Sequence, residues 1–373
     1  MPAPLGALTP AAFLHDYWQK RPLLVRGAFP GFGSALDGDE LADLACDADV
    51  ESRIVSRADG RYETRIGPFS SEDFGALGDR DWTLLVQDVD KQVPELVTVL
   101  DQFTFLPAWR IDDLMVSWAA DGGSVGPHVD QYDVFLLQGS GTRRWQVGTL
   151  DASGFVATDE WLLQPGDMLY LPPGLPHWGV AVGPCMTWSI GLRAPSAAEL
   201  VSDFCERASA PLTDAERYSD PDLTADEGGD GRLSEAALAR ARALLDATLA
   251  ATHADLPRWF GELVTAPKAW LHPVPPDTLL DREALAACAD TQRLVRDPRT
   301  RIAWFPMPDG TLRVCVDGHS EVVPAALEPL VRRLCGPREF PAGTLTRYLD
   351  DDGAAALVLR LYNGGQLTEA DDD

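Results

Sequence analysis

Two stretches of the sequence are the most informative about the fold: SVGPHVDQYDVF at residues 124–135 and LPPGLPHWGV at residues 171–180. The first carries His128 and Asp130, and the second carries His177. Two imidazoles and one carboxylate can hold Fe(II) on one face and leave the other face open. Residues i and i+2 of an extended strand point to the same side, so an H-x-D triplet can direct both ligands at one ion. These three residues are therefore the candidate catalytic metal ligands.

The residues around the H-x-D triplet favour a metal site over a chance match, which is common in chains of this length. Residues 122–127 predict an irregular approach, and the aromatic and aliphatic residues of 132–138 predict a strand. The glycines within 139–142 suggest a turn, and 143–147 suggest a returning strand. The sequence thus predicts a hairpin after the first two ligands.

The position of His177 decides whether it is a ligand, because a lone histidine beside a tryptophan is more often a packed structural residue. Turns are expected at residues 164–167 and 172–174, on either side of a short strand at 168–171. His177 follows His128 by 49 residues. In a barrel of short antiparallel strands, that length lets the chain run around the wall and return beside the first pair.

Three segments resemble the bacterial JmjC-type ribosomal oxygenases of the cupin superfamily. They are PHVDQYDVFLLQGSGTRRWQVG at 127–148, QPGDMLYLPPGLPHWG at 164–179 and FLHDYWQKRPLLVRGAF at 13–29. The resemblance covers most of residues 1–200 and, less distinctly, the remainder. It implies a mostly β double-stranded β-helix (jelly-roll) barrel as the catalytic domain over 1–195. A helical dimerisation segment over 196–266 and an α+β winged-helix-like domain over 267–373 are expected to follow.

The resemblance implies hydroxylation that depends on Fe(II), with 2-oxoglutarate and dioxygen as cosubstrates. Three protein ligands leave three positions on an octahedral iron for the keto acid and dioxygen. Arg143 matches the family's position for the residue that holds the remote carboxylate of 2-oxoglutarate. Strand alternation lets only one of Arg143 and Arg144 point inward. Ser117 is a second candidate cosubstrate contact, although Ala119 stands where some relatives have a small hydroxyl residue. The presence of Asp130 as a carboxylate ligand argues against halogenation.

The substrate is less determined by the residues than the chemistry is. The resemblance is greatest to enzymes that β-hydroxylate an arginine of protein number sixteen of the large ribosomal subunit. A histidine or another side chain, a small molecule, and a non-catalytic barrel that binds a protein remain alternatives. A pocket for arginine needs a carboxylate or tyrosine near the iron, and the candidates by proximity are Asp121, Tyr132 and Asp133.

Composition limits the partners and the compartment. The 373 residues exceed one core, so two or three domains are expected. The net charge of −27 disfavours direct nucleic-acid binding and suits a basic ribosomal protein, although a salt-adapted or high-GC source would also produce it. No apolar run approaches the roughly 18 residues that span a bilayer. The start, Met1-Pro2-Ala3-Pro4, lacks a basic segment leading into a signal helix. We therefore expect a cytoplasmic protein that makes no membrane contact.

The six cysteines predict neither a disulfide framework nor a metal site. No C-x-x-C pair is present, and we expect reduced core residues at positions 46, 185, 205, 288, 315 and 335.

The part after the barrel is expected to be helical first and then mixed. Ser196 and Glu199 have capping-box spacing, which predicts a helix start. The run EAALARARALLDATLAATH at 235–253 places Leu238, Ala241, Leu245 and Leu249 on one helical stripe. Such a stripe usually packs within its own domain, but it can also be buried against a second copy, and with the family resemblance it predicts a homodimer interface. A helix at 282–293 and a hairpin about Pro308-Asp309-Gly310 suggest a winged helix. Residues 261–373 carry 12 basic and 18 acidic side chains, a net charge of −6 that favours protein over DNA as the partner.

Overall fold

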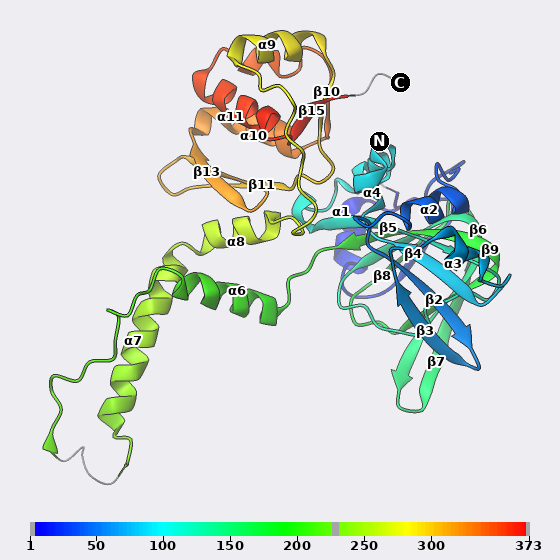
Figure 1. Ribbon diagram of the computed structural model, residues 1–373, viewed down its shortest axis with the longest axis horizontal. Helices are drawn as coiled ribbons and strands as arrows, with labels where there is room; N and C mark the ends of the chain where they lie inside the picture. The colour runs from blue at the N-terminus through cyan, green and yellow to red at the C-terminus, as the bar shows by residue number, and fades with distance from the viewer. Residues whose placement is uncertain (1–3, 226–230, 371–373) are drawn as a thin grey trace. The chain divides into compact units, whose positions relative to one another are not determined.

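The computed structural model describes residues 4–225 and 231–370, which form two compact units. The first unit comprises Met1–Ala194, Pro267–Ile302 and Ala326–Asp373, and the second comprises Pro195–Ala266 and Ala303–Ala325. Figure 1 labels the elements of each unit. None of the described helices has the length and apolar character that a membrane crossing requires. The expected domain boundaries at residues 195 and 266 stay predictions.

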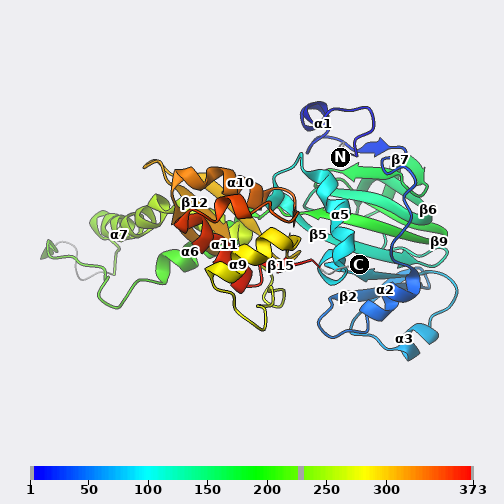
Figure 2. The same ribbon diagram turned by 90° about the horizontal axis from the view of Figure 1, so that it is seen from above.

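The first unit contains an antiparallel sheet of nine strands in the order β1-β8-β6-β9-β5-β4-β2-β3, with β7 paired to β6. Figure 2 shows β6 and β9 side by side, and these two strands pair over most of their length. The arrangement agrees with the predicted mostly β barrel. The strands are β1 (Leu23–Val25), β2 (Ser52–Ala58), β3 (Arg61–Ile66), β4 (Trp82–Val86), β5 (Ile111–Ala119), β6 (Val134–Asp151), β7 (Gly154–Leu163), β8 (Met168–Leu171) and β9 (His177–Leu192).

Short helices accompany this sheet, and their sequences explain where several of them begin. Ser70 and Asp73 form a capping box at α3, and Asp37 and Glu40 form another at α2. Thr9 accepts a hydrogen bond from the Ala12 amide at the start of α1. The helices are α1 (Pro10–Asp16), α2 (Gly38–Leu44), α3 (Ser71–Gly75), α4 (Val89–Gln92) and α5 (Val97–Leu100).

The strands separate two apolar clusters, because successive side chains point to opposite faces. One cluster packs the sheet against the N-terminal helices, where the Phe13 ring lies 5.0 Å from the Tyr170 ring between centroids. The other fills the barrel interior and consists of Val134, Leu136, Trp145, Val147, Leu163, Leu169 and Leu171. The barrel interior therefore has an apolar wall at the level of these residues.

The predicted hairpin after the metal-ligand segment is wrong, because β6 continues without a turn from Val134 to Asp151. The glycine-rich segment 139–142 forms bulges against β9, where the register shifts between Gln138 and Ser140 and again between Ser140 and Thr142. Gly141 has a φ of +62°, and a Cβ there would lie 2.1 Å from the Pro184 carbonyl oxygen. Glycine at this position lets the two strands stay paired across the bulge.

The bulges also change which residues of β6 face the barrel interior. Before them, Val134 and Leu136 belong to the interior cluster, and after them Trp145 and Val147 do. The inward positions thus change from even to odd numbers, since a bulge places an extra residue on one strand. This change turns Arg143 inward and leaves Arg144 exposed.

In the second unit, the described residues form three α-helices and a three-stranded sheet. As predicted, α6 (Ala197–Ser209) begins at the Ser196–Glu199 capping box, and α7 (Glu235–Ala254) begins at the N-cap Ser234. Helix α8 (Leu256–Thr265) follows α7 directly. The sheet has the order β11-β12-β13, with β11 at Ile302–Pro306, β12 at Leu312–Val316 and β13 at His319–Val323.

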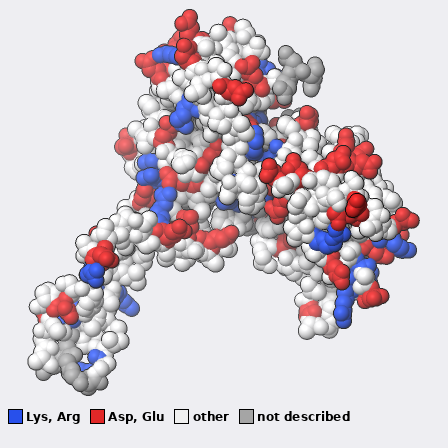
Figure 3. All heavy atoms as spheres, in the orientation of Figure 1, with Lys and Arg blue, Asp and Glu red and all other residues white. Residues whose placement is uncertain are grey.

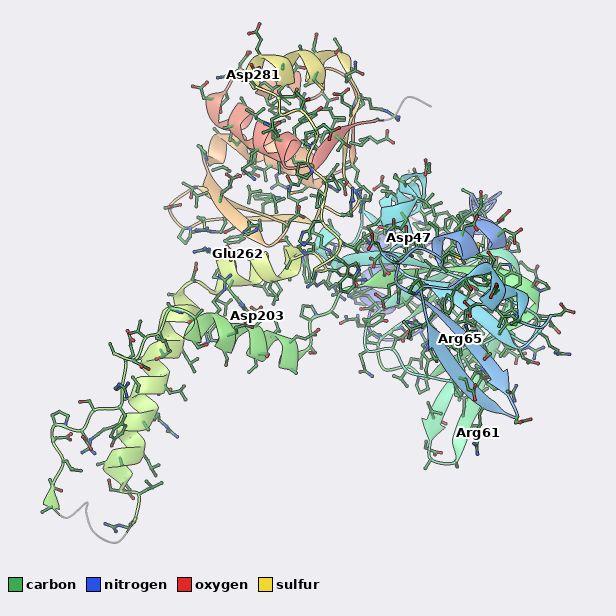
Figure 4. The ribbon with its side chains drawn as sticks, viewed as in Figure 1. Asp47, Arg61, Arg65, Asp203, Glu262 and Asp281 are labelled. Carbon is green, nitrogen blue, oxygen red and sulfur yellow. The ribbon has the colours of Figure 1, made fainter. Side chains whose placement is uncertain are left out.

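Glu262 connects the elements of the second unit through a buried carboxylate. It accepts hydrogen bonds from Arg207 of α6, from Arg258 Nε at 2.8 Å and from Ser320 Oγ of β13 at 2.6 Å. Figure 4 labels Glu262 on α8 and Asp203 on the neighbouring α6, where Asp203 accepts from the Trp259 indole. Burial acts to raise the pKa of Glu262, but these hydrogen bonds and the guanidinium charges outweigh it and hold the pKa at about 2.

The C-terminal part contains a second small sheet and three helices. Its strand order is β14-β10-β15, and the predicted helix at 282–293 is present as α9, with Asp281 as its N-cap. Figure 4 labels Asp281 at this helix start. The elements are α9 (Arg282–Thr291), β10 (Leu294–Arg296), α10 (Glu328–Cys335), β14 (Glu339–Phe340), α11 (Asp352–Asn363) and β15 (Leu367–Glu369).

All six cysteines are free, as expected. Cys185 and Cys315 are buried, but Cys46 and Cys205 are exposed, so the expectation of core positions is wrong for these two. The sequence offers no periodic apolar pattern at Cys46 or Cys205 that would predict burial.

Figure 3 shows Lys and Arg side chains dispersed among Asp and Glu on the face in view.

Candidate metal centre and cosubstrate pocket

His128 and His177 are held side by side by their own backbones. The His128 amide donates to the His177 carbonyl and the His177 amide donates to the His128 carbonyl, both at 3.0 Å. Nδ1 of His128 lies 3.0 Å from the Gly126 carbonyl oxygen, and Nδ1 of His177 lies 2.9 Å from the Leu175 carbonyl oxygen. Because a carbonyl only accepts, each Nδ1 carries the proton and each Nε2 presents a lone pair.

Asp130 completes a group of three ligand atoms. Its Oδ1 lies 3.8 Å from His128 Nε2, and its Oδ2 lies 3.6 Å from His177 Nε2. One atom from each residue lies within 4.8 Å of the other two. Such spacing leaves room for an ion at metal–ligand distances of about 2.1 Å. The donor set of two imidazoles and a carboxylate on one side fits a non-haem Fe(II) centre.

The electrostatics of His177 suit a ligand. Its ring is buried, and burial lowers the pKa of the imidazole below its usual value, with the nearby His128 as the second cause. The neutral imidazole, which is the form that binds a metal, is therefore favoured at neutral pH.

The expected placement of His128 and Asp130 on one extended strand is wrong. His128 forms an isolated bridge with His177, and Asp130 lies in the irregular segment before β6. The Gly174 amide donates to the Asp130 carbonyl at 2.8 Å and so ties this segment to the turn before β9. Convergence of the ligands comes from these backbone contacts and not from strand alternation.

Arg143 lies deep in the barrel among polar side chains. Its Nη1 lies 3.3 Å from Ser117 Oγ on β5 and 3.3 Å from Thr187 Oγ1 on β9. The Thr187 hydroxyl donates in turn to the Gln138 side-chain oxygen at 3.2 Å. The Nε of Arg143 is buried and has no hydrogen-bond partner among the described residues. A buried guanidinium with an unused donor fits the carboxylate of a bound small molecule.

Arg144, the alternative to Arg143, points away from the barrel interior. It is exposed, and its Nε lies 3.7 Å from Glu160 Oε1 of β7. Ser117 is buried on the same face of β5 as Ala119, which is also buried. The structure therefore brings Arg143 and Ser117 together and leaves Arg144 outside.

The three residues considered for a substrate pocket separate into different environments. Asp133 is fully buried and accepts from Tyr170, Gln19 and Arg110 at 2.6, 2.9 and 3.0 Å, which makes it a structural residue. Asp121 accepts from the Gly183 amide at 2.9 Å and pairs with Arg80 at 3.3 Å, as a loop cap would. Tyr132 is 46% exposed, and the charge of the metal ligand Asp130 acts on its phenol.

Asp113 and Met115, two further residues near Tyr132, were not predicted from the sequence. Burial raises the pKa of the Tyr132 phenol, and the negative charges of Asp130 and Asp113 add to this effect, which places both carboxylates near it. Asp113 and Met115 lie on β5 at even spacing from Ser117, so the three share one strand face. The even spacing from Ser117 was the sequence signal that could have identified Asp113 and Met115, because Ser117 was already a candidate cosubstrate contact.

Asp113 has an unusual environment for a carboxyl group. It is buried, and burial raises its pKa to about 7, while the positive charge of Lys91 opposes the change. Its Oδ2 accepts from the Asp88 amide at 3.2 Å. Arg53 of β2 lies beside the same face, with its Nη2 at 3.9 Å from the Met115 sulfur. The mouth of the barrel thus combines a buried carboxyl, a phenol and a thioether.

Comparison with known proteins assigns both parts of the chain. The JmjC domain family matches residues 98–200, and the ROXA-like winged helix matches residues 247–368. The predicted architecture, a β barrel followed by a helical segment and a winged-helix domain, is thereby confirmed.

A curated relative and a solved structure each align with nearly the whole chain. Ribosomal protein uL16 3-hydroxylase of Escherichia coli strain K12 is 38% identical over 369 residues, 95% of each chain. A probable ribosomal oxygenase of Haemophilus influenzae is 38% identical over 59% of this chain and 56% of its own. The structure of YcfD, a ribosomal oxygenase from Escherichia coli, in complex with cobalt and 2-oxoglutarate has a TM-score of 0.84 at 34% identity and covers 98% of this chain and 99% of its own. The chain therefore belongs to the JmjC-type ribosomal oxygenases with a ROXA-like winged helix.

Proposed function

We propose that this protein is an Fe(II)- and 2-oxoglutarate-dependent dioxygenase that hydroxylates the β-carbon of an arginine in ribosomal protein uL16 of the large subunit. The observation that carries the proposal is the convergence of His128 Nε2, His177 Nε2 and the Asp130 carboxylate, with Arg143 buried in the same barrel. The relative of known activity aligns over 95% of the chain.

Different residues of the barrel have different roles in the proposed reaction. His128, Asp130 and His177 would hold Fe(II). With dioxygen and 2-oxoglutarate, the bound iron would supply the oxidation that inserts one oxygen atom into a carbon–hydrogen bond, with succinate and carbon dioxide as the other products. Arg143 binds the remote carboxylate of the keto acid through charge-assisted hydrogen bonds, and Ser117 orients the guanidinium or contacts the same carboxylate. The apolar wall around Trp145 excludes water from the bound keto acid.

The buried carboxyl of Asp113 supports a cationic substrate side chain. A carboxylate with a pKa near 7 is stabilised in its charged form when a cation enters the same space. A guanidinium meets a carboxylate with two parallel hydrogen bonds, and its aliphatic stem can pack on Met115 and Tyr132. Arginine fits these three residues better than a neutral side chain does.

The acidic surface supports a basic protein partner in place of nucleic acid. A net charge of −27 attracts a basic, extended segment and repels phosphates. We expect the enzyme to act in the cytoplasm, on uL16 before its assembly into the ribosome, because the target carbon must come close to the iron.

Homodimer formation is part of the proposal and rests on α7. None of the described side chains of this 20-residue helix is buried, and Leu238 and Leu245 are 56% and 58% exposed. Helix α7 contacts α6, where the His253 and Phe204 rings lie 4.9 Å apart between centroids. Its apolar side chains that stay exposed can be buried against a second copy. The second chain would add no metal ligand.

Mass spectrometry of uL16 tests the proposed activity. We expect uL16 from wild-type cells to carry one extra oxygen atom on an arginine, and uL16 from cells without this gene to lack it. Restoring the gene with Asp130→Ala should not restore the modification. An arginine modified equally in both strains would refute the substrate, and a modified histidine would support the alternative side chain.

A spectroscopic experiment separates an enzyme from a binding module with the same barrel. Under anaerobic conditions, Fe(II) and 2-oxoglutarate together should give the weak visible band of a chelated keto acid. A protein without this band that still binds uL16 would be a protein-binding module.

A further inference from the structure

A cavity of about 220 Å³ lies in the first unit, between the segment around residues 91–112 and residues 296–338. None of the metal ligands lines it. The wall includes two hydroxyl side chains, those of Thr104 and Thr300. The charged side chains of the wall are Lys91, Asp101, Asp112, Arg296, Arg301 and Arg338.

Two arginines are brought together in this cavity by strand pairing. Val295 of β10 lies opposite Glu339 of β14, and the Arg296 amide donates to the Arg338 carbonyl at 2.9 Å. The backbone therefore places Arg296 and Arg338 on neighbouring strands. Two like charges at such positions are unfavourable unless an anion accompanies them.

Hydrogen-bond donors of Arg296, Thr300 and Arg338 in the wall are unused. Arg296 Nε, Arg338 Nη1 and Thr300 Oγ1 are shielded from solvent and have no partner among the described residues. Arg296 is 8% exposed and Thr300 is 6% exposed. One other guanidinium atom of Arg296, Nη1, donates to the Leu334 carbonyl. Buried donors without acceptors are rare, and each costs free energy.

Two of the four cations in the wall already have carboxylate partners. Lys91 Nζ lies 3.3 Å from Asp88 Oδ1 and 3.1 Å from Asp90 Oδ2, and neither aspartate lines the cavity. Arg301 donates to Asp112. The positive charges that remain for the cavity belong to Arg296 and Arg338.

A single carboxyl opposes these two guanidinium groups. Burial raises the pKa of Asp101, and the positive charges of Arg338 and Arg296 act against this change. Burial also lowers the pKa of Arg296 to about 10, with the charge of Arg338 as the second cause. Arg296 therefore stays protonated at neutral pH. Four cationic side chains and two carboxyls line the cavity, so its wall has more positive than negative charge.

We propose that this cavity is a second ligand site, distinct from the metal centre, which binds a small oxyanion of the size of inorganic phosphate. Arg296 Nε and Arg338 Nη1 donate to two of its oxygens, and the Thr300 hydroxyl donates to a third. A tetrahedral oxyanion can accept from donors on several sides, and guanidinium groups match its geometry. The carboxyl of Asp101 lines the same cavity and favours a partly protonated anion, whose hydroxyl can donate a hydrogen bond to it.

Titration of the full-length protein with sodium phosphate tests the site. Thermal unfolding and calorimetry are followed at constant ionic strength, with sodium chloride and sodium acetate as parallel arms. We expect saturable binding of one phosphate per chain and a rise in the unfolding temperature that follows the same saturation curve. Chloride should give no saturable effect. Acetate that binds as tightly as phosphate would change the ligand from a tetrahedral oxyanion to a carboxylate.

Variants locate the bound phosphate. Arg338→Gln should weaken phosphate binding about tenfold or more, because a charge-assisted contact is lost. Thr300→Val keeps the volume of the side chain and removes only the hydroxyl, so a weakening of about threefold is expected. Arg347→Gln removes the same charge at an exposed position outside the cavity and is the matched control. Arg143→Gln tests whether phosphate enters the barrel instead.

The pattern of phosphate affinities across these variants decides whether the anion occupies the cavity. Loss of binding in Arg338→Gln and Thr300→Val, with normal binding in Arg347→Gln and Arg143→Gln, supports the site. Equal affinities in all four variants would show nonspecific binding and overturn it. Loss of binding in Arg143→Gln alone would place phosphate at the cosubstrate pocket and overturn it as well. If Arg338→Gln does not fold, Thr300→Val decides the result.

Discussion

Arg143 Nη1 on β6 lies 3.3 Å from Ser117 Oγ on β5, although the two strands are separated by β9. The Thr187 hydroxyl of the intervening strand lies at the same distance from Nη1. A guanidinium held by hydroxyls from two other strands has a fixed direction, and its buried Nε remains available. The arrangement fits a group that receives a carboxylate in one orientation.

Replacement of Asp130 by alanine should abolish turnover and weaken Fe(II) binding, because one of three ligands is lost. The fold should remain, since the side chain is 26% exposed and the backbone carbonyl still accepts from the Gly174 amide. Calorimetry with Fe(II) or Mn(II), together with a turnover assay, measures both effects. Normal turnover by this variant would remove Asp130 from the metal site.

Replacement of Arg143 by alanine should raise the KM for 2-oxoglutarate far more than the KM for the protein substrate. The loss of a charge-assisted contact costs about 2–3 kcal/mol, or roughly 30- to 150-fold in affinity. Arg144→Ala is the matched control, because that side chain is exposed on the same strand. Similar increases in both KM values would indicate general misfolding or the wrong arginine.

Replacement of Gly141 by alanine should disturb the bulge that directs Arg143 inward. The new Cβ would lie 2.1 Å from the Pro184 carbonyl oxygen, at a φ of +62° that favours glycine. We expect a lower unfolding temperature and a higher KM for 2-oxoglutarate. Gly183→Ala is the comparison, because it has a similar positive φ and no atom near the added Cβ. Identical behaviour of the two variants would show that only backbone strain matters.

Replacement of Glu262 by glutamine should destabilise the second unit at neutral pH. Its pKa is lowered from 4.5 to about 2. A group with a lowered folded-state pKa stabilises the fold above its unfolded value of 4.5 and loses that contribution as pH falls toward 2. The expected difference is about 3 kcal/mol at pH 7 and should shrink between pH 4.5 and 2. Hydrogen exchange of the α8 amides measures it. A difference independent of pH would show that the carboxylate charge is not responsible.

Glutamate at positions 245 and 249 should convert the proposed dimer to monomers in light scattering, because burying two carboxylates in an apolar helix interface is unfavourable. Glutamate at Val274 and Leu279, both 65% exposed, adds the same charge at positions outside α7 and should leave the dimer intact. If the α7 variant stays dimeric and stable, the interface lies elsewhere.

Local patterns were sufficient for the elements whose signals lie close together in the sequence. The Ser196–Glu199 spacing predicted the start of α6, and the turns on either side of a short apolar run predicted the strand β8. Such features depend on contacts within a few residues, so the chain carries them without reference to the rest of the fold. The conjunction of His128, Asp130 and His177 predicted a candidate metal site, and the structure brings one ligand atom of each residue within 4.8 Å of the others.

The glycine segment 139–142 shows where local patterns were insufficient. Glycines predict a turn as readily as a bulge, and the choice depends on whether a partner strand lies alongside. Here β9 does, so β6 continues and its inward face changes to the odd-numbered residues. A simple alternation from Leu136 would have turned Arg144 inward.

Residue type and short-range spacing were enough to predict the ligand chemistry and the positions of several helix starts, and the resemblance of three segments to a known family implied the β-rich barrel. The folded chain was needed to show that Asp133 is a structural acceptor for Tyr170, that Asp113 joins Tyr132 at the barrel mouth, and that Arg296 lies beside Arg338. These relationships join residues far apart in the chain. Strand pairing and burial bring such residues together, and a linear pattern contains neither.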